Sequence, residues 1–279
     1  MRFGGNTSCL ELRSAHGELL VLDAGTGIRG LGAALLQEGD LRPIHLLLTH
    51  LHGDHVLGLP HFVPLIALPR EAGREAVRVI AGAHSALEVE ALLTAMATPP
   101  LFPAVDGLLA QLRYVDWPGS APYEVGTLRV QRWPARHPGG AAIFRVDDSV
   151  GALCAFAPDN ELSGDSALAE VRAWRAALVS FLHGVPLLIH DATYTADEAR
   201  RFSAWGHSSA HEATQLAMEC EAETLALFHH HPDRDDHAID RLLDDCRTLV
   251  HRAGSALRLF AASEGLVLQV PSVADALLP

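Results

Sequence analysis

The segment that most constrains this chain is Thr49-His50-Leu51-His52-Gly53-Asp54-His55, which directly follows the apolar run Ile44–Leu48. The run has the length and composition of a buried strand, so it would deliver four ligand-type side chains to one strand end. Alternate residues of an extended segment point the same way, so His50 and His52 can bind one metal ion. The aspartate and the last histidine follow a glycine that lets the chain turn, and they can face a second ion. A polar loop at a strand end is the plain alternative, and this density of ligand-type residues disfavours it.

The charge balance narrows what such a chain can bind. Its formal net charge of −13 disfavours a large nucleic acid as partner, because that affinity depends mainly on cationic contacts to phosphates. The sequence contains no lysine, so all 21 basic residues are arginines and any mechanism that needs a lysine is excluded. The 17 histidines exceed what packing requires, and this favours metal binding or proton transfer.

The sequence also predicts a location. No apolar run is long enough to span a bilayer, and the start Met1-Arg2-Phe3 has no basic and apolar signal pattern, so no membrane contact is expected. None of the four cysteines (Cys9, Cys154, Cys220 and Cys246) belongs to a CxxC pair, and each lies in or beside an apolar segment. This is typical of buried free thiols in a reducing compartment, so a cytoplasmic location is predicted.

Short apolar runs alternate with longer helical patterns along the whole chain. The predicted strands are Thr7–Arg13, Glu18–Leu22, Ile44–Leu48, Val77–Ile80, Leu112–Val115, Thr127–Trp133, Ala141–Val146, Gly151–Ala157, Pro186–His190, Thr224–Phe228, Ala256–Phe260 and Gly265–Val270. The predicted helices are Arg29–Gln37, Ser85–Met96, Ser166–Leu182, Ser209–Cys220 and Asp235–His251. Strand pairs joined by turns are mixed with strand–helix–strand units, which predicts an α/β (α+β) chain with a mixed sheet or two sheets. No linker interrupts this pattern, so a single domain over residues 1–279 is expected.

The histidine motif resembles the HxHxDH signature of the metallo-β-lactamase superfamily. The resemblance implies a four-layer αββα sandwich with two divalent metal ions along one edge of its two sheets. It also implies that His137, Asp159 and His229, each at a predicted strand end, complete the ligand set. The implied metal ligands are His50, His52, Asp54, His55, His137, Asp159 and His229. Asp159 would bridge both ions, and the adjacent His230 and His231 are alternatives to His229. Zinc is the first expectation, with manganese, iron or cobalt as alternatives.

A second resemblance narrows the branch. The segments Leu187–Thr193 and Gly206–Ala213 look like those of tRNase Z-type phosphodiesterases. This likeness implies that His207 is an acid or transition-state stabiliser and that Asp191 orients it, and Asp54 is counted with them as catalytic. The plain alternative makes His207 a helix-start residue and Asp191 a strand-end cap. In the implied reaction a hydroxide bridging the two ions attacks the phosphorus, and a cationic His207 assists the departing alkoxide.

The implied substrate is a small phosphodiester. The relevant tRNA-processing enzymes carry a long substrate-gripping arm between the positions that match His137 and Asp159, whereas this chain has room there only for two strands and a turn. Gly4–Cys9, Leu22–Gly27 and the proline-rich residues 99–103 resemble cyclic-nucleotide phosphodiesterase-like members, so a cyclic nucleotide is expected. Three alternatives stay open: a hydrolase of esters, thioesters or lactones, an RNA 3′-end phosphodiesterase, and a non-enzymatic metal- or nucleotide-binding module.

Three further expectations come from the same resemblance. Family members usually have another strand before the Gly-Gly-Asn segment, so the chain is expected to lack that first N-terminal strand. The excursion Leu92–Pro103 is expected either to cover the site or to pack against another subunit, and a homodimer is predicted from dimeric relatives. Asp23–Gly27 is expected to form a glycine turn near the metals, with an ordinary tight turn as the alternative.

Overall fold

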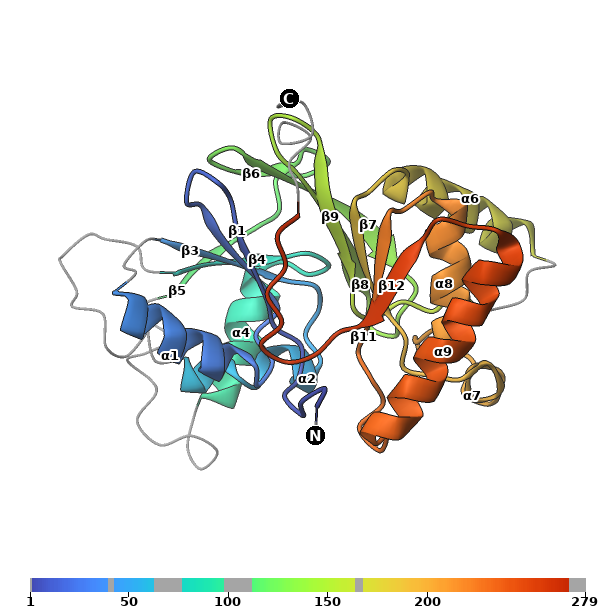
Figure 1. The fold of residues 1–279 in the computed structure, drawn as a ribbon. Helices are drawn as coiled ribbons and strands as arrows, with labels where there is room; N and C mark the ends of the chain where they lie inside the picture. Colours follow the sequence, from blue (N-terminus) through green and yellow to red (C-terminus); the bar gives the residue numbers. More distant parts are fainter. Residues whose placement is uncertain (1, 40–42, 63–76, 98–111, 164–167, 271–279) are drawn as a thin grey trace, which may run out of the picture. The chain divides into compact units, whose positions relative to one another are not determined.

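The computed structural model describes residues 2–39, 43–62, 77–97, 112–163 and 168–270 (Figure 1). By its internal packing the chain divides into two compact units. The first unit is Asn6–Leu128, and the second combines Met1–Gly5 with Arg129–Pro279. The predicted single domain over the whole length stays a prediction, and each unit is described by itself.

The first unit is built on a sheet with the strand order β1-β2-β3-β4-β5. Its strands are β1 (Leu10–Arg13), β2 (Leu19–Leu22), β3 (Ile44–Leu48), β4 (Val77–Ala81) and β5 (Leu112–Val115), and β6 (Tyr123–Val125) follows. β1 pairs antiparallel with β2, whereas β2 to β5 run parallel. The helical segments are α1 (Ile28–Glu38), α2 (Gly53–Val56), the 3-10 helix η1 (Leu59–His61) and α4 (Ala86–Met96). α1 and α4 pack on the same face of the sheet (Figure 1).

Burial explains why β2 and β3 are almost continuously apolar. In β3, Ile44, Leu46 and Leu48 belong to the core that α1 and α4 complete, while Leu47 on the opposite face is also fully buried. A strand covered on both faces does not alternate with polar residues, which is typical of parallel sheets. The run Ile44–Leu48 was predicted with its observed bounds because this signal is so strong.

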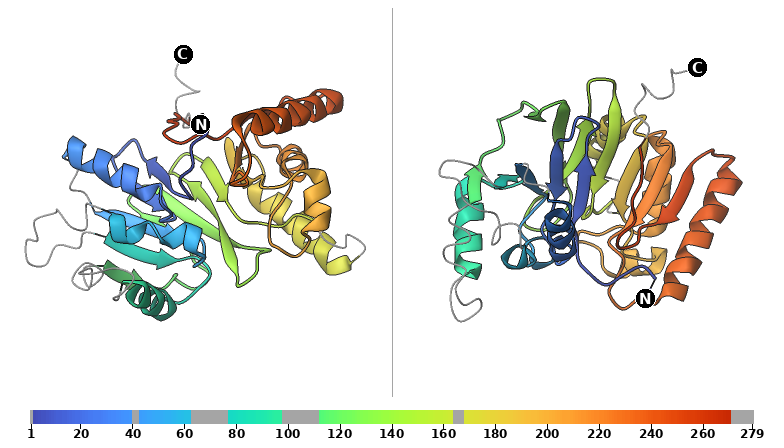
Figure 2. Two further views of the ribbon diagram at one scale, coloured as in Figure 1. Left: turned by 90° about the horizontal axis from the view of Figure 1, so that it is seen from below. Right: turned by 60° about the vertical axis from the view of Figure 1, so that its left-hand side comes forward.

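In the second unit, strands β7 to β12 follow the order β12-β11-β10-β9-β8-β7. They are β7 (Leu128–Ala135), β8 (Ala141–Asp147), β9 (Ala152–Ala157), β10 (Leu187–Asp191), β11 (Thr224–Phe228) and β12 (Arg258–Ala261), with helices α6 (Ala169–Leu182), α7 (Ala196–Arg201), α8 (Ala210–Glu219) and α9 (Asp236–Ala253). β7, β8 and β9 pair antiparallel, whereas β9 to β12 are parallel. α6, α8 and α9 cover one face of these strands (Figures 1 and 2).

This topology sends several strand ends to one edge of each sheet. β7, β9, β10 and β11 all run in the same direction, so their carboxyl ends share one edge in the second unit. In the first unit, β2 and β3 are parallel neighbours that also end together. Loops after the carboxyl ends of such strands commonly bind ligands. Every residue predicted to bind a metal ion follows one of these ends.

The structure confirms the predicted mixed α/β class with two sheets and helices, and it corrects some elements. Gly265–Val270 was predicted as a strand, and this is wrong: the segment has no sheet partner and Val267 is 86% exposed. Four short elements, β6, α2, η1 and α7, were missed because they offer only one turn or a few residues of periodicity. Residues 98–103 of the proline-rich excursion lie outside the described residues.

The remaining expectations concern thiols and membrane contact. All four cysteines are free, and Cys154, Cys220 and Cys246 are buried. Burial raises the pKa of Cys154 to about 12 and those of Cys220 and Cys246 to about 11, so these thiols are unreactive near neutral pH. Within the described ranges, the helices are too short or too polar to cross a membrane.

A half-buried carboxylate in the first unit, that of Glu18, generates a pH-dependent prediction. The Glu18 carboxylate accepts hydrogen bonds from the Ser14 hydroxyl and from Thr127 N at 2.9 Å. Gly126 makes this approach possible, because a Cβ there would lie 1.9 Å from Glu18 Oε1. The hydrogen bond from Ser14, aided by Thr127, lowers the pKa of Glu18 from 4.5 to about 2.

We expect Glu18→Gln to lower the Tm by a few degrees at pH 6 to 7, where the carboxylate is ionised in both folded and unfolded chains. The Tm gap to the unsubstituted protein should shrink as the pH falls from about 4.5 towards 2, because the folded-state advantage of the charged group is then lost. Scanning calorimetry at several pH values measures the gap. The exposed Glu124→Gln is the control, and a gap independent of pH would contradict the assignment.

Candidate metal centre

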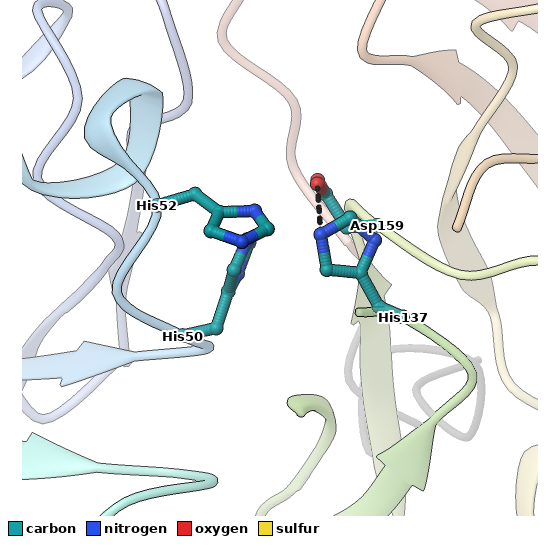
Figure 3. A group of neighbouring side chains, drawn as sticks. All are labelled: His50, His52, His137 and Asp159. Carbon is teal, nitrogen blue, oxygen red and sulfur yellow. Dashed lines mark ion pairs between the residues drawn. The ribbon is translucent and has the colours of Figure 1, made fainter. Parts of the chain in front are cut away.

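In the first unit, the end of β3 carries the histidine motif. The His50 side chain is buried at 1% exposure, His52 is exposed at the N-cap of α2, and His55 is fully buried within α2. The ring centroids of His50 and His52 lie 4.6 Å apart, and those of His50 and His55 lie 4.2 Å apart. Asp54 Oδ2 is 3.4 Å from His55 Nε2. The structure therefore brings together all four ligand-type residues of the motif, two of which are drawn in Figure 3.

A buried carboxylate beneath the motif holds these rings in place. Asp23 is fully buried and accepts hydrogen bonds from His55 Nδ1 at 2.7 Å and from Thr49 N at 2.8 Å. The Thr49 hydroxyl donates to Asp23 and can accept from His50 Nδ1, 3.1 Å away. Both rings thus use Nδ1 for a hydrogen bond and keep Nε2 available as a metal ligand, which is the usual role of a carboxylate behind a ligand histidine.

The glycine turn after Asp23 packs directly against the motif. A Cβ on Gly25 would lie 2.2 Å from the backbone oxygen of Asp54, so only glycine fits there. The turn is also tied to the motif by the hydrogen bond from Ala24 N to His55 O at 2.7 Å. Of the two alternatives for Asp23–Gly27, the structure therefore supports a specialised turn beside the candidate ligands.

In the second unit, three histidines surround the carboxylate of Asp159, which is 2% exposed. His137 Nε2 lies 3.5 Å from Asp159 Oδ2, and this ion pair is dashed in Figure 3. His229 Nε2 lies 3.4 Å from Oδ1, and His207 Nε2 lies 3.9 Å from Oδ2. Asp159, His207 and His229 form a group of ligand atoms that could hold a metal ion. Side chains that follow β7, β9 and β11 therefore converge within this unit.

The structure distinguishes His229 from its two neighbours. His229 adopts a left-handed φ of 56° and presents Nε2 to Asp159, while its Nδ1 lies 3.1 Å from the Thr193 hydroxyl. His230 points elsewhere: its Nε2 donates to Ala262 O at 3.0 Å. His231 lies beside Asp233, with 4.0 Å between Nδ1 and Oδ2.

Asp191 is the second buried carboxylate. It is fully buried at the end of β10 and accepts from Thr193 N at 2.9 Å and from His207 Nδ1 at 2.9 Å. Asn160 N and Ser208 N each donate to its Oδ2 at 3.2 Å. The arrangement matches the predicted pairing, in which Asp191 fixes the ring of His207.

The surroundings of His207 favour its protonated form. Burial alone would lower the pKa of His207, but the hydrogen bond from its ring to Asp191 and the charges of Asp191 and Asp159 outweigh it. The net result is a raised pKa, despite the nearby ring of His229. With its side chain 16% exposed, His207 can still reach a bound molecule.

The donor set fits divalent transition metals. His50, His55, His137 and His229 each have Nδ1 beside a protein oxygen, on Thr49, Asp23, Gly206 and Thr193 respectively. The Nε2 atoms of His55, His137 and His229 lie within 3.5 Å of a carboxylate oxygen, so nitrogen and oxygen ligands stand together. Histidine nitrogen combined with carboxylate oxygen suits zinc, manganese, iron or cobalt.

Two other polar residues near these groups, Arg136 and His190, have different surroundings. Arg136 donates from Nη1 to Ser163 O at 2.8 Å, and its guanidinium lies over the ring of Trp174. His190 is fully buried, donates from Nδ1 to Asp191 O at 2.8 Å, and has its pKa lowered by burial. Arg136 is therefore held by protein groups, and His190 is a packed neutral histidine behind Asp191.

Sequence reasoning did not assign roles to Asp23 and Glu161. Asp23 lies in Leu22–Gly27, where an acidic residue at a strand end before two glycines was a usable signal, because a buried strand rarely ends on an unpaired carboxylate. Glu161 is 5% exposed and follows Asp159-Asn160 without any pattern that marks it. Its contacts are with a loop more than forty residues away, which local sequence cannot predict.

The chain is similar to known proteins along most of its length. A sequence profile described as the Beta-lactamase superfamily domain matches residues 19–230. Ribonuclease Z of Haloarcula marismortui is 27% identical over 280 aligned residues, which cover 87% of this chain and 86% of that protein.

Solved structures give the same picture of the fold. The metallo-β-lactamase fold protein YhfI of Bacillus subtilis has a TM-score of 0.68 at 17% identity, with 96% of both chains covered. Unliganded yeast PDE1 also has a TM-score of 0.68, at 15% identity, covering 95% of this chain and 96% of that one. At these identities the likeness concerns the fold.

The contacts of Asp23 generate a test of the metal centre. We expect Asp23→Asn to weaken metal binding by about 10- to 100-fold, because His55 loses the carboxylate that fixes its ring. Titration of the metal-free protein with Zn²⁺ against a competing chelator measures the affinity. Asp245→Asn, on an exposed position of α9, is the matched control. Unchanged affinity in a folded Asp23→Asn protein would show that the carboxylate does not serve the metal.

Proposed function

Since this chain belongs to the β-lactamase superfamily, we propose that it is a metal-dependent phosphodiesterase acting on a small diester, with a cyclic nucleotide as the expected substrate. Superfamily membership and the fold were predicted from the histidine motif, and the tRNase Z-like branch from Leu187–Thr193 and Gly206–Ala213. The profile match and the ribonuclease Z relative confirm these predictions. The superfamily is one of hydrolases. Phosphodiester cleavage and the identity of the substrate are the proposal.

The proposed ligands are the seven predicted residues. His50, His52, His137 and Asp159 would hold one ion, and Asp54, His55, Asp159 and His229 would hold the other, with zinc as the first expectation. Bound divalent ions supply an activated water and polarise a phosphoryl oxygen. Support comes from the Nδ1 contacts described above, which fix the orientation of four of these rings, and from the carboxylates beside three of their Nε2 atoms.

The observation that carries phosphodiester chemistry is the contact between His207 and Asp191. A ring held at 2.9 Å by a buried carboxylate, with a raised pKa, is suited to protonate or stabilise a departing alkoxide. An alkoxide is a poor leaving group, so a proton donor placed beside it assists the cleavage of a diester that releases one. Asp191 would act through His207, holding the tautomer that places the proton on Nδ1 and the reactive position on Nε2.

The hairpin between β8 and β9 favours a small substrate. These strands are joined only by a short turn in which Asp148 accepts from Val150 N and Gly151 N. A long arm that could grip a folded RNA is therefore missing between the positions of His137 and Asp159. The net charge of −13 supports the same conclusion.

RNA processing is the second candidate, because the ribonuclease Z relative covers most of both chains. Hydrolysis of an ester, thioester or lactone remains the third. The cytoplasmic location and the homodimer stay predictions from the sequence and the resemblance.

The role of His207 leads to a direct test. We expect His207→Ala to lower kcat by about 10²- to 10⁴-fold on a diester with an alkoxide leaving group, with metal content unchanged. Steady-state kinetics and elemental analysis measure the two quantities, and the exposed His237→Ala is the control. Equal activity of the His207→Ala and unsubstituted proteins would remove this mechanism.

A substrate screen tests the proposed class. Metallated protein is offered cyclic mononucleotides, cyclic dinucleotides, a precursor tRNA, and panels of esters and lactones. We expect the highest kcat/KM on a cyclic nucleotide. Preferred cleavage of the precursor tRNA would replace this proposal with the ribonuclease alternative, and preferred ester or lactone cleavage would replace both.

A further inference from the structure

Besides Asp159 and Asp191, the second unit has another buried carboxylate, which is not among the candidate metal ligands. Glu161 is 5% exposed, and each of its oxygens accepts a backbone hydrogen bond from the same short turn. Oε1 accepts from Ala204 N at 2.9 Å, and Oε2 accepts from Gly206 N at 2.9 Å. The hydroxyls of Ser203 and Ser163 add longer contacts to Oε1 at 3.5 and 3.4 Å. Among the described residues, the donors to Glu161 are thus amides and hydroxyls.

The turn that Glu161 holds has an unfavourable backbone. Ala204 has a φ of 70° and Gly206 has a φ of 88°, so two of three consecutive residues are left-handed. For alanine this conformation costs about 1–2 kcal/mol. The turn therefore needs stabilisation by a group outside it. The amides of residues 204 and 206 both donate to that group, the Glu161 carboxylate.

The same turn connects two residues of the centre. Gly206 O accepts from His137 Nδ1 at 2.9 Å, and the next residue in the chain is His207. Gly206 approaches so closely that a Cβ would lie 2.2 Å from His137 Nδ1. A displacement of the Gly206 peptide would therefore move the acceptor of His137 and the backbone that enters His207.

The helix after this turn has its own supports. Ser209 and Glu212 form a complete capping box at the start of α8, and Ala210 N donates to Tyr194 O at 3.0 Å. These bonds do not involve Glu161. Loss of the Glu161 carboxylate should therefore loosen residues 203–207 and leave α8 folded.

We propose that Glu161 is a positioning residue: its two oxygens clamp the 203–206 turn and so set the place of His207 and the orientation of His137. This inference rests on the proposed function in one respect, the use of His207 for the leaving group. The clamp itself can be measured without any substrate.

The test uses the metallated full-length protein with Glu161→Gln and Glu161→Ala, and Glu170→Gln at an exposed position of α6 as control. Glutamine keeps one acceptor oxygen and places an amide group opposite the other backbone N–H, so it should be intermediate. Hydrogen exchange followed by mass spectrometry should show faster exchange in residues 203–207 and unchanged exchange in α8. Zn²⁺ affinity should fall by up to about tenfold, because His137 loses its fixed acceptor.

The kinetic readout compares two leaving groups at saturating metal. On a diester that releases an alkoxide, we expect kcat to fall by about 10- to 100-fold in Glu161→Ala, because a displacement of about 1 Å is enough to misplace His207. On bis-p-nitrophenyl phosphate, whose leaving group needs no proton, kcat should stay within about threefold. A merely structural defect would lower both activities equally.

Each result decides between the proposals. Equal losses on both diesters, or unchanged exchange of residues 203–207, would overturn the positioning role of Glu161. If the unsubstituted protein cleaves neither diester, the proposed function fails, whereas the exchange and Zn²⁺ measurements still decide whether Glu161 clamps the turn.

Discussion

Hydrogen bonds from histidine rings to buried carboxylates underlie the candidate site in both units. Asp23 holds His55 at 2.7 Å in the first unit, and Asp191 holds His207 at 2.9 Å in the second. A buried carboxylate is costly unless several donors satisfy it, and each of these two accepts three or more hydrogen bonds. Since each ring uses Nδ1 for its carboxylate, Nε2 is the atom left for chemistry. In the proposed function, these two carboxylates therefore determine which ring nitrogen is placed for chemistry.

The two sheets place these groups by the same rule. Apolar parallel strands are stable only when both faces of their sheet are covered. The polar residues that follow these strands lie together at the edge where the strands end. In the second unit, this rule brings His137 after β7 and His229 after β11 to Asp159 after β9, although up to 92 positions separate them in sequence. In the first unit, it brings Asp23 after β2 beneath the motif that follows β3. Within each unit, the shared direction of the strands therefore brings the candidate site residues together.

Much of this was predictable from sequence, and the failures have physical causes. The motif around His50 was recognisable because four ligand-type residues follow one apolar strand, and Thr224–Phe228 and Leu112–Val115 were predicted with their observed bounds. His229 could be preferred over His230 only by its place after β11 and by the resemblance, and the structure gives the reason: His230 is engaged with Ala262. Glu161 could not be found, because its role depends on backbone amides of a distant turn, and amides leave no mark in sequence. Gly265–Val270 had the composition of a strand but lacks a sheet partner.

The backbone strain of this chain is concentrated where its chemistry is proposed. Of the four described non-glycine residues with positive φ, Asp23 holds His55, His229 faces Asp159, and Ala204 lies in the turn before His207. Such conformations cost free energy that the rest of the fold must offset. Selection for thermal stability alone would therefore favour substitutions that remove the positive φ at these three positions. Such substitutions would raise the stability and lower the proposed activity. A stabilised form of this protein that keeps its function should carry its changes in the helices that cover each sheet, away from these strand ends.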